Sequence, residues 1–207
     1  MLYSLFKKSK SRKAPRNIVG QKLPLKSDQI WAIRIRLELQ NKLRDLSLFN
    51  MAIDSMLRSC DLVKLTVRDI YRGEDITSRA QIIQKKTGQP VQFEITKKTK
   101  LAIKNWVDYA NLSFDDYLFK SRQHNSKHIS TRQYARIVDR WVTSIGLDKT
   151  LYGTHSLRRT KASIIYRESK NIRAVQILLG HTKIESTVRY LGVEVDDALE
   201  LAERIDI

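Results

Sequence analysis

Apolar residues recur every three or four positions along most of the chain, which is the spacing of one face of an α-helix. Ser27, Thr96 and Ser130 each precede such a stretch, and their hydroxyl groups can cap a helix N-terminus. Gly146 and Gly180 follow two of the stretches, at positions where a helix end favours glycine. The faces predicted to point into the core are those of Ile30, Ile33 and Leu37; Leu46, Phe49, Ile53 and Met56; Ile103, Trp106, Val107 and Ala110; Leu157 and Ile164; and Ile172, Val175, Leu178 and Leu179.

After the first predicted helices the spacing of apolar positions changes to that of β-strands. Residues 76–84 and 91–95 are rich in β-branched residues, and residues 85–90, Lys-Lys-Thr-Gly-Gln-Pro, have the composition of a turn. We predict an antiparallel hairpin with Lys86 at its mouth. Length and hydrophobic content fit one main domain, so the expected fold is mainly α with a small antiparallel β-sheet.

A break in the helical pattern follows Met56. Ser59 can cap a short helix that runs to Leu65, and Arg58 falls at the break, three residues before Asp61. The acid could orient the arginine so that its guanidinium points into a cavity. The alternative is an exposed Arg58–Asp61 ion pair, which would contribute little to stability.

The charge of the chain indicates a nucleic-acid partner. Lys and Arg number 39 against 22 Asp and Glu, which gives a formal net charge of +17 and a pI near 10.1. A balance this basic is most often found in proteins that bind nucleic acid, less often in those that bind anionic membranes. The single cysteine, Cys60, excludes an internal disulfide, and no stretch approaches the roughly 20 apolar residues of a membrane span. We expect a cytoplasmic, nucleoid-associated protein with no membrane partner.

Residues 1–26 form a basic N-terminal segment with eight basic residues, two prolines and no acid. Because such a segment cannot bury enough apolar surface to offset the entropy lost on ordering, we expect a flexible arm. Its role is open between a solubilising tail and an arm that lies along DNA phosphates. The basic residues expected to contact DNA are Lys7, Lys8, Lys10, Arg12, Lys13 and Arg16 of the arm, and Lys85, Arg122, Lys127, Arg132 and Arg159 elsewhere.

Two histidines stand where a metal site could be suspected. His124 and His128 are four residues apart, as two metal ligands on a helix would be. They fall in a polar loop without a nearby carboxylate or cysteine, so we expect no metal. The chain also lacks a glycine-rich phosphate loop, so we expect no nucleotide cofactor.

The last third of the chain gathers two imidazoles, a guanidinium and a phenol. His155 and Arg158 are three residues apart, so on a helix they share a face. His181 comes directly after the predicted end of a helix, and Tyr190 follows nine residues later. These four side chains are expected to meet in one cleft.

Attack of a tyrosine hydroxyl on a phosphodiester needs these residue types. Negative charge accumulates on the nonbridging oxygens in the transition state, and the guanidinium groups of Arg58 and Arg158 can bind those oxygens bidentately. Tyr190 has an intrinsic pKa near ~10 and needs a base, a role that fits His155. Lys86 could protonate the departing 5′ oxygen. A covalent phosphotyrosine would preserve the bond energy, so the strand could be rejoined without ATP.

Three motifs carry a resemblance to a known family: residues 155–160 (His-Ser-Leu-Arg-Arg-Thr), residues 178–181 (Leu-Leu-Gly-His) and Tyr190. With them, residues 25–207 resemble the catalytic domain of the tyrosine recombinases, or phage integrases. The resemblance implies a tyrosine recombinase catalytic-domain fold over residues 27–207, 3′-phosphotyrosyl intermediates and strand exchange in a tetramer on double-stranded DNA, with no metal, ATP or other cofactor.

The resemblance also implies a role for each matching residue. Arg58 looks like the first catalytic arginine, Asp61 its supporting acid, Lys86 the general acid on the hairpin, His155 and Arg158 the histidine and second arginine of the central motif, His181 the residue that holds the phosphate, and Tyr190 the nucleophile. Asp61 stands where glutamate is more usual in the family. Lys85, next to Lys86, is a second candidate for the general acid.

The ends of the chain lead to two further expectations. Typical members of the family carry a core-binding domain ahead of the catalytic one, and the roughly 25 residues before the first predicted helix are too few for such a domain. We therefore expect weak DNA binding by a single copy, assisted by the arm, neighbouring protomers or an accessory protein. Residues 194–207 are acidic, with apolar residues at helical spacing, so we expect a helix that avoids DNA and packs on its own core or on the next protomer.

The leading interpretation is a site-specific DNA recombinase that performs integration, inversion or resolution. One alternative is a catalytically inactive DNA-binding regulator or scaffold with the same fold. Another is a type IB topoisomerase, which shares the chemistry but relaxes supercoils without a specific paired site.

Overall fold

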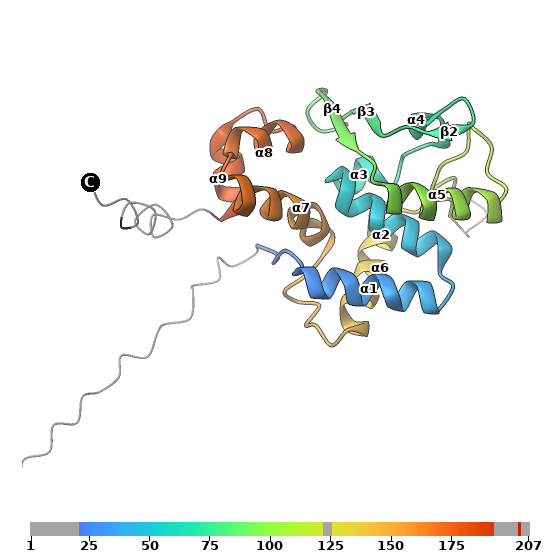
Figure 1. Cartoon of the computed structure of the whole chain (residues 1–207), viewed down its shortest axis with the longest axis horizontal. Coiled ribbons are helices and arrows are strands. Elements are labelled where there is room, and N and C mark those ends of the chain that lie inside the picture. Colours follow the sequence, from blue (N-terminus) through green and yellow to red (C-terminus); the bar gives the residue numbers. More distant parts are fainter. Residues whose placement is uncertain (1–20, 122–125, 193–202, 204–207) are drawn as a thin grey trace, which may run out of the picture.

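The computed structural model describes residues 21–121, 126–192 and 203, and shows a mainly helical domain with two short β-hairpins (Figure 1). The fold class predicted from the sequence is confirmed. In chain order the described elements are α1 (Ser27–Leu39), α2 (Leu43–Ser55), α3 (Ser59–Leu62), α4 (Val67–Ile70), β1 (Tyr71–Arg72), β2 (Asp75–Ile76), β3 (Arg79–Ile83), β4 (Pro90–Glu94), α5 (Lys97–Tyr109), α6 (Thr131–Ser144), α7 (Thr154–Ser169), α8 (Ile172–Leu179) and α9 (Ile184–Leu191).

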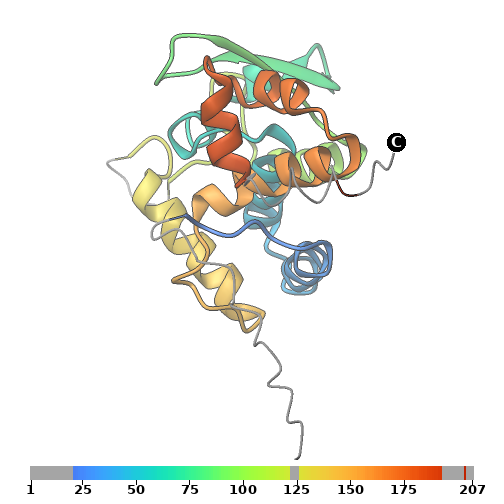
Figure 2. The same cartoon turned by 90° about the vertical axis from the view of Figure 1, so that its left-hand side faces the viewer.

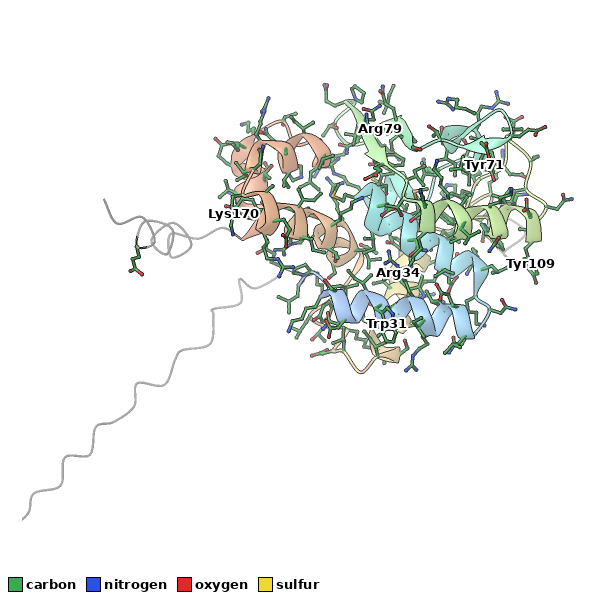
Figure 3. The ribbon with its side chains drawn as sticks, viewed as in Figure 1. Trp31, Arg34, Tyr71, Arg79, Tyr109 and Lys170 are labelled. Carbon is green, nitrogen blue, oxygen red and sulfur yellow. The ribbon has the colours of Figure 1, made fainter. Side chains whose placement is uncertain are left out.

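Helix α2 lies at the centre of the core. Every residue from Leu46 to Ser55 is buried, and α1, α5, α7 and β4 pack around the helix. The polar side chains of α2 find partners in these neighbours. Asp54 accepts a hydrogen bond from the amide of Thr96 at 2.9 Å, and Asn50 accepts one from Arg34 of α1 at 2.7 Å, where the two helices lie side by side (Figure 3). These hydrogen bonds help α2 to be buried on all sides, although Nδ2 of Asn50 has no partner within the described residues.

The β-structure of the described residues consists of two separate two-stranded antiparallel sheets, whereas the sequence analysis predicted one. β3 pairs with β4, with buried Ala80 opposite buried Phe93. The predicted first strand, residues 76–84, is too long. Ile76 belongs instead to β2, because the chain reverses at Gly73 (φ +62°) and forms the β1–β2 hairpin.

The helix caps predicted at Thr96 and Ser130 are confirmed. The hydroxyl groups of Thr96 and Ser130 each accept a hydrogen bond from a backbone amide in the first turn of α5 and α6. The prediction for Ser27 is wrong, because the N-cap of α1 is Lys26. The amide of Lys26 donates to the side chain of Gln29 at 2.9 Å and so satisfies the helix start from inside the helix.

Helices α7, α8 and α9 form a group beside the β3–β4 hairpin (Figures 1 and 2). Gly146 after α6 and Gly180 after α8 both have the left-handed backbone expected of glycines at helix ends. Gly180 lets the chain turn back immediately into α9. The small core of this group contains Met56, Ala162, Val175 and Leu179, with Tyr190 packed against it.

Residues 21–25, which we call the strap, are bound to the domain, so the prediction of a flexible arm through residue 26 does not hold for this part. Leu25 is 2% exposed and belongs to the main core. Its apolar side chain is thus buried although basic residues lie close to it in sequence. The hydrogen bonds of the strap run from the Leu25 amide to Thr160 Oγ1 (3.0 Å), from the Leu23 amide to the Leu151 carbonyl (2.9 Å), from Lys22 Nζ to the Thr150 carbonyl (2.6 Å), and from Gln21 Nε2 to the carbonyls of Arg189 (2.8 Å) and Tyr190 (3.2 Å).

The remaining predictions about the chain ends and one loop concern residues outside the described ranges. They are the basic arm over residues 1–20, Arg122 and His124 of the loop, and the acidic tail helix apart from residue 203. Within the described residues, none of the helices is long and apolar enough to cross a membrane.

Removal of the strap should destabilise the domain, whereas removal of the preceding residues should not. Compared with a chain that lacks residues 1–20, a chain that lacks residues 1–25 loses the buried side chain of Leu25 and the hydrogen bonds above. We expect a loss of about 3 kcal/mol in the free energy of unfolding, from ~2 kcal/mol for the leucine and ~1 kcal/mol for hydrogen bonds. Urea unfolding of the two truncated chains measures this difference, and equal stabilities would contradict the role of the strap.

Candidate active site

Arg158 is held in the interior by the carbonyl ends of two helices. It lies on α7 and is 3% exposed. Its Nη1 donates to the carbonyl of Met56, the C-cap of α2, and its Nη2 donates to the carbonyl of Leu179, the last residue of α8, at 2.8 Å. Carbonyls at a helix C-terminus have no partner within the helix and carry a partial negative charge. The guanidinium therefore bridges two helix ends, and among the ion pairs of the described residues none joins it to a carboxylate.

Arg58 enters the site from the opposite side, at the break between α2 and α3. Helix α2 ends because Met56 takes a left-handed backbone (φ +50°). Arg58 itself has the extended backbone of an N-cap, so the predictions that Ser59 caps the short helix and that this helix reaches Leu65 are both wrong. The half-buried side chain of Arg58 donates from Nη1 to Oε1 of Gln84.

Gln84 connects the two candidate arginines. Its side chain is fully buried at the end of β3, where Oε1 accepts from Arg58 and from Thr87 Oγ1, the latter at 3.0 Å. Its Nε2 donates at 3.3 Å to the carbonyl of Leu179, which also binds Arg158. Neither Gln84 nor Thr87 was predicted from the sequence to belong to the site. The available signal was a polar residue at the end of an apolar strand, directly before Lys-Lys-Thr-Gly.

Asp61 adopts neither of the two arrangements predicted for it. It is 6% exposed, and no ion pair within the described residues joins it to Arg58. Its Oδ1 accepts from the backbone amide of Lys85 at 2.9 Å and from Cys60 Sγ at 3.7 Å. The short helix α3 turns the carboxylate away from Arg58 and toward the hairpin. Asp61 therefore fixes the start of the turn that carries the two lysines.

His155 lies in the first turn of α7 and faces this turn. The side chain of His155 is exposed, yet neighbouring atoms desolvate its ring, and this desolvation, followed by the positive charges of Arg158 and Arg58, lowers the pKa of His155 below its ordinary value. Lys86 is among the further charges that lower this pKa, although its side chain is exposed. A neutral His155 can accept a proton near pH 7. The backbone of Lys85 is bound to Asp61, and of the two lysines Lys86 is the one whose charge lowers the pKa of His155.

His181 follows Gly180 and packs against the tyrosine. Burial, and then the charges of Arg158 and Arg58, lower the pKa of His181 to about 4. Its Nδ1 lies 3.1 Å from the hydroxyl oxygen of Thr187, which is the buried residue of α9. The imidazole is therefore neutral at pH 7, and its edge meets the ring of Tyr190 at a centroid distance of 5.4 Å.

Tyr190 is the centre around which the other side chains gather. Its ring lies 5.9 Å from the Arg158 guanidinium carbon and 5.5 Å from that of Arg159. The hydroxyl group is buried and makes no hydrogen bond of regular geometry within the described residues, although it lies close enough to the Arg158 guanidinium for a polar interaction. Burial raises the pKa of Tyr190 to about 12, although the nearby arginines oppose this rise. The tyrosine is therefore a neutral phenol in this structure.

Arg159 was expected from the sequence to contact DNA, but its side chain is buried inside the domain. It is 6% exposed, and its Nη1 donates to the carbonyl of Lys22 in the strap at 2.6 Å. Its guanidinium covers the ring of Tyr190 instead. The next residue on a helix points about 100° away, so adjacent Arg158 and Arg159 meet different partners.

The other predicted DNA contacts within the described residues are exposed: Lys85, Lys127 and Arg132. Within the described ranges no group of three metal-ligating side chains occurs. The structure thus brings together Arg58, Arg158, His181 and Tyr190, leaves His155 and Lys86 exposed within range of these charges, and gives Asp61 a different partner from the one predicted.

A comparison with known proteins identifies this arrangement. The family model described as the phage integrase family matches residues 25–196. The chain belongs to the phage integrase family. The protein named "Probable integrase/recombinase YoeC" of Bacillus subtilis is 30% identical over 174 residues, which cover 84% of this chain and 91% of that protein. The tyrosine recombinase XerC of Neisseria gonorrhoeae is 29% identical over 162 residues, which cover 76% of this chain and 50% of XerC. The predicted class, a tyrosine-type site-specific recombinase, is confirmed.

Solved structures support the same fold. XerA recombinase matches 89% of this phage integrase chain with a TM-score of 0.71 at 19% identity, over 65% of its own chain. XerH recombinase, in a pre-cleavage complex with its difH substrate, matches 90% of this chain with a TM-score of 0.69 at 18% identity, over 56% of its own chain. The phage integrase chain thus spans nearly all of YoeC but about half the length of XerC.

The low pKa of His181 should make the protein less stable in acid. Because the folded protein binds this proton more weakly than the unfolded chain, whose histidine pKa is near 6.5, stability present above pH 6.5 is lost as the pH falls toward 4. The variant His181→Asn should lose less of its free energy of unfolding between pH 7 and pH 4.5 than the natural chain. Urea unfolding at several pH values compares the two slopes, and identical slopes would show that His181 does not carry the effect.

Proposed function

We propose that this chain cleaves and rejoins DNA strands at specific sites through a 3′-phosphotyrosyl intermediate on Tyr190. The observation that carries the proposal is the convergence of Arg58, Arg158 and His181 around one buried tyrosine, in a fold shared with the tyrosine recombinases. The family and the relatives support recombination, and the roles of the individual residues are our assignment.

In the proposed reaction the arginines bind the scissile phosphate. Arg58 and Arg158 are held by neutral oxygen atoms, so the phosphate would be their counter-ion. Its two nonbridging oxygens gain charge as the phosphorus becomes five-coordinate, and preorganised donors stabilise that charge. The Thr187 hydroxyl can donate to Nδ1 of neutral His181, which leaves an Nε2 proton for a phosphate oxygen.

Two proton transfers complete the proposed step. The Tyr190 hydroxyl transfers its proton to His155 as its oxygen bonds to phosphorus, and the bond from phosphorus to the 5′ oxygen breaks. Lys86 protonates that oxygen. The lowered pKa of His155 keeps its imidazole neutral and able to accept the proton. The phosphate that binds both arginines would also draw the tyrosine hydroxyl out of its buried position.

Double-stranded DNA is the proposed substrate, in the nucleoid of the cytoplasm. The net charge of +17 supports this, and XerH, a structural neighbour, was solved bound to its difH substrate. Strand exchange requires two cleaved sites, so we propose a tetramer on paired sites, assisted by an accessory DNA-binding protein. Integration, inversion and resolution use this same chemistry.

The variant Tyr190→Phe should form no covalent adduct with DNA, because it lacks the attacking oxygen. Nicked duplexes with randomised sequence, in which the short strand diffuses away after cleavage, trap the adduct and select the preferred site. The natural chain and Tyr166→Phe, a variant of a second tyrosine on α7, should both become labelled. Adducts on Tyr190→Phe would refute the assignment, and binding without any adduct on the natural chain would identify a noncatalytic DNA-binding protein.

Deletion of residues 1–20 should weaken DNA binding and reduce its dependence on salt. Each DNA phosphate that these residues neutralise adds about 0.9 to the slope of log K against log salt concentration, so the truncated chain should show a shallower slope. Fluorescence titration of a duplex at increasing KCl concentrations measures this slope, and the truncated chain keeps the strap and therefore the fold. If the slope were unchanged, these residues would be a solubilising tail.

A further inference from the structure

The side chain amide of Gln84 is the meeting point of three chain segments. It connects the helix break at Arg58, the hairpin turn at Thr87 and the end of α8 at Leu179. The Gln84 side chain is fully buried, and its hydrogen bond to Leu179 is shielded from water, whereas the bonds to Arg58 and Thr87 are partly buried. Residues 84 and 179 are 95 positions apart, and their hydrogen bond ties the two halves of the site together.

The three contacts need both a donor and an acceptor. The carbonyl oxygen of the amide has two lone pairs, which accept from Arg58 and from Thr87, and the NH₂ group donates to Leu179. A methionine has a similar length but could make none of these bonds well. A glutamate could accept from Arg58 and Thr87, but its second oxygen would face the Leu179 carbonyl without a proton to share.

The end of α8 fits closely against this amide. A Cβ atom at Gly180 would lie 3.1 Å from both Gln84 Oε1 and Nε2 and would overlap Val91 of β4. Gly180 also has a left-handed backbone at φ +62°, which favours glycine. The absence of a side chain at Gly180 therefore lets Leu179 reach Gln84, and it sets the start of the segment that carries His181.

The neutrality of the amide matters as much as its geometry. Arg58 has no carboxylate partner among the ion pairs of the described residues, and the nearest acid in sequence, Asp61, is bound to the Lys85 amide. A carboxylate in hydrogen-bond contact would offset most of the charge that Arg58 presents to a phosphate. The amide orients the guanidinium and leaves its charge unpaired.

We propose that Gln84 is a positioning residue for the recombination reaction: it orients Arg58 through a neutral acceptor, shares the Leu179 carbonyl with Arg158, and thereby keeps the full charge of Arg58 available to the scissile phosphate. The inference rests on the proposed function. It predicts an effect on catalysis that depends on the charge of the substrate, which a purely structural residue would not produce.

The test compares two substrates in each of three variants. The substrates are the nicked duplex selected by the natural chain and the same duplex with a methylphosphonate at the scissile position, where a neutral methyl group replaces one charged oxygen. The variants are Gln84→Glu, Gln84→Met and, as a matched control on the same strand, Gln81→Glu at an exposed position. Single-turnover cleavage rates are measured with saturating protein.

Gln84→Glu should slow cleavage of the phosphate duplex about 100-fold, the size of effect expected when one preorganised donor is lost. It should slow cleavage of the methylphosphonate duplex by less than about 5-fold, because that substrate depends less on positive charge. Gln84→Met keeps the charge of Arg58 but loses its orientation, and should slow both substrates by similar factors. Gln81→Glu should leave both rates within about 2-fold of those of the natural chain.

The ratio of the two rates within one variant decides the outcome. Partial unfolding removes active protein equally for both substrates and cancels in this ratio, so a destabilised variant still gives an answer. Equal losses of Gln84→Glu on the two substrates, with normal cleavage by the natural chain, would overturn the positioning role while leaving the proposed function intact. No cleavage of the phosphate duplex by the natural chain would overturn both.

Discussion

The site depends on the binding of one buried guanidinium by the ends of two helices. Burial of a charge away from water is costly unless hydrogen bonds compensate for it, and Arg158 is compensated by the terminal carbonyls of α2 and α8. These carbonyls need donors in any case, because a helix leaves its last carbonyl groups without partners. These two hydrogen bonds therefore satisfy the terminal carbonyls of the helices, and they hold the Arg158 cation without an ion pair to a carboxylate among the described residues. The positions of Met56 and Leu179 fix where α2, α7 and α8 meet, and Gln84 and His181 take their places from that junction.

The hydrogen-bond partners of the two arginines are neutral, and within the described ranges the buried Asp61 is the one carboxylate whose charge raises the pKa of Arg158, so the site keeps a net positive charge that affects its other groups. The histidines have lowered pKa values because their rings are desolvated beside the same cations, so both are uncharged near neutral pH. Tyr190 responds in the opposite direction, because the effect of burying its hydroxyl exceeds the attraction of the cations for a phenolate. The site thus carries positive charge that suits an anion, while the Tyr190 hydroxyl stays protonated.

The spacing of residues along the sequence was enough to predict much of the fold and of the candidate site. The helical faces, the hairpin lysines and the cluster from His155 to Tyr190 depend on residues close together in sequence. Other features depend on packing that no local pattern encodes. Asp61 is three residues from Arg58, yet the turn of α3 directs it to the Lys85 amide. Arg159 was expected on the surface, because most arginines are exposed. Instead it donates a hydrogen bond to the carbonyl of Lys22, which lies 137 residues earlier in the chain. The role of Gln84 likewise exists only once α8 has docked on the hairpin.

The strap connects the N-terminal side of the domain directly to the segment that carries Tyr190. Gln21 is bonded to the backbone of Tyr190, and the next residue is bonded to the arginine that covers the tyrosine ring. A pull or a rotation applied at residue 20 therefore reaches α9 through one side chain, without passing through the core. Helix α9 is short, and it is held by buried Thr187 and by Tyr190 and Leu191, which pack against the small core. A tag, a linker or a neighbouring molecule attached ahead of the strap would therefore act on the position of α9.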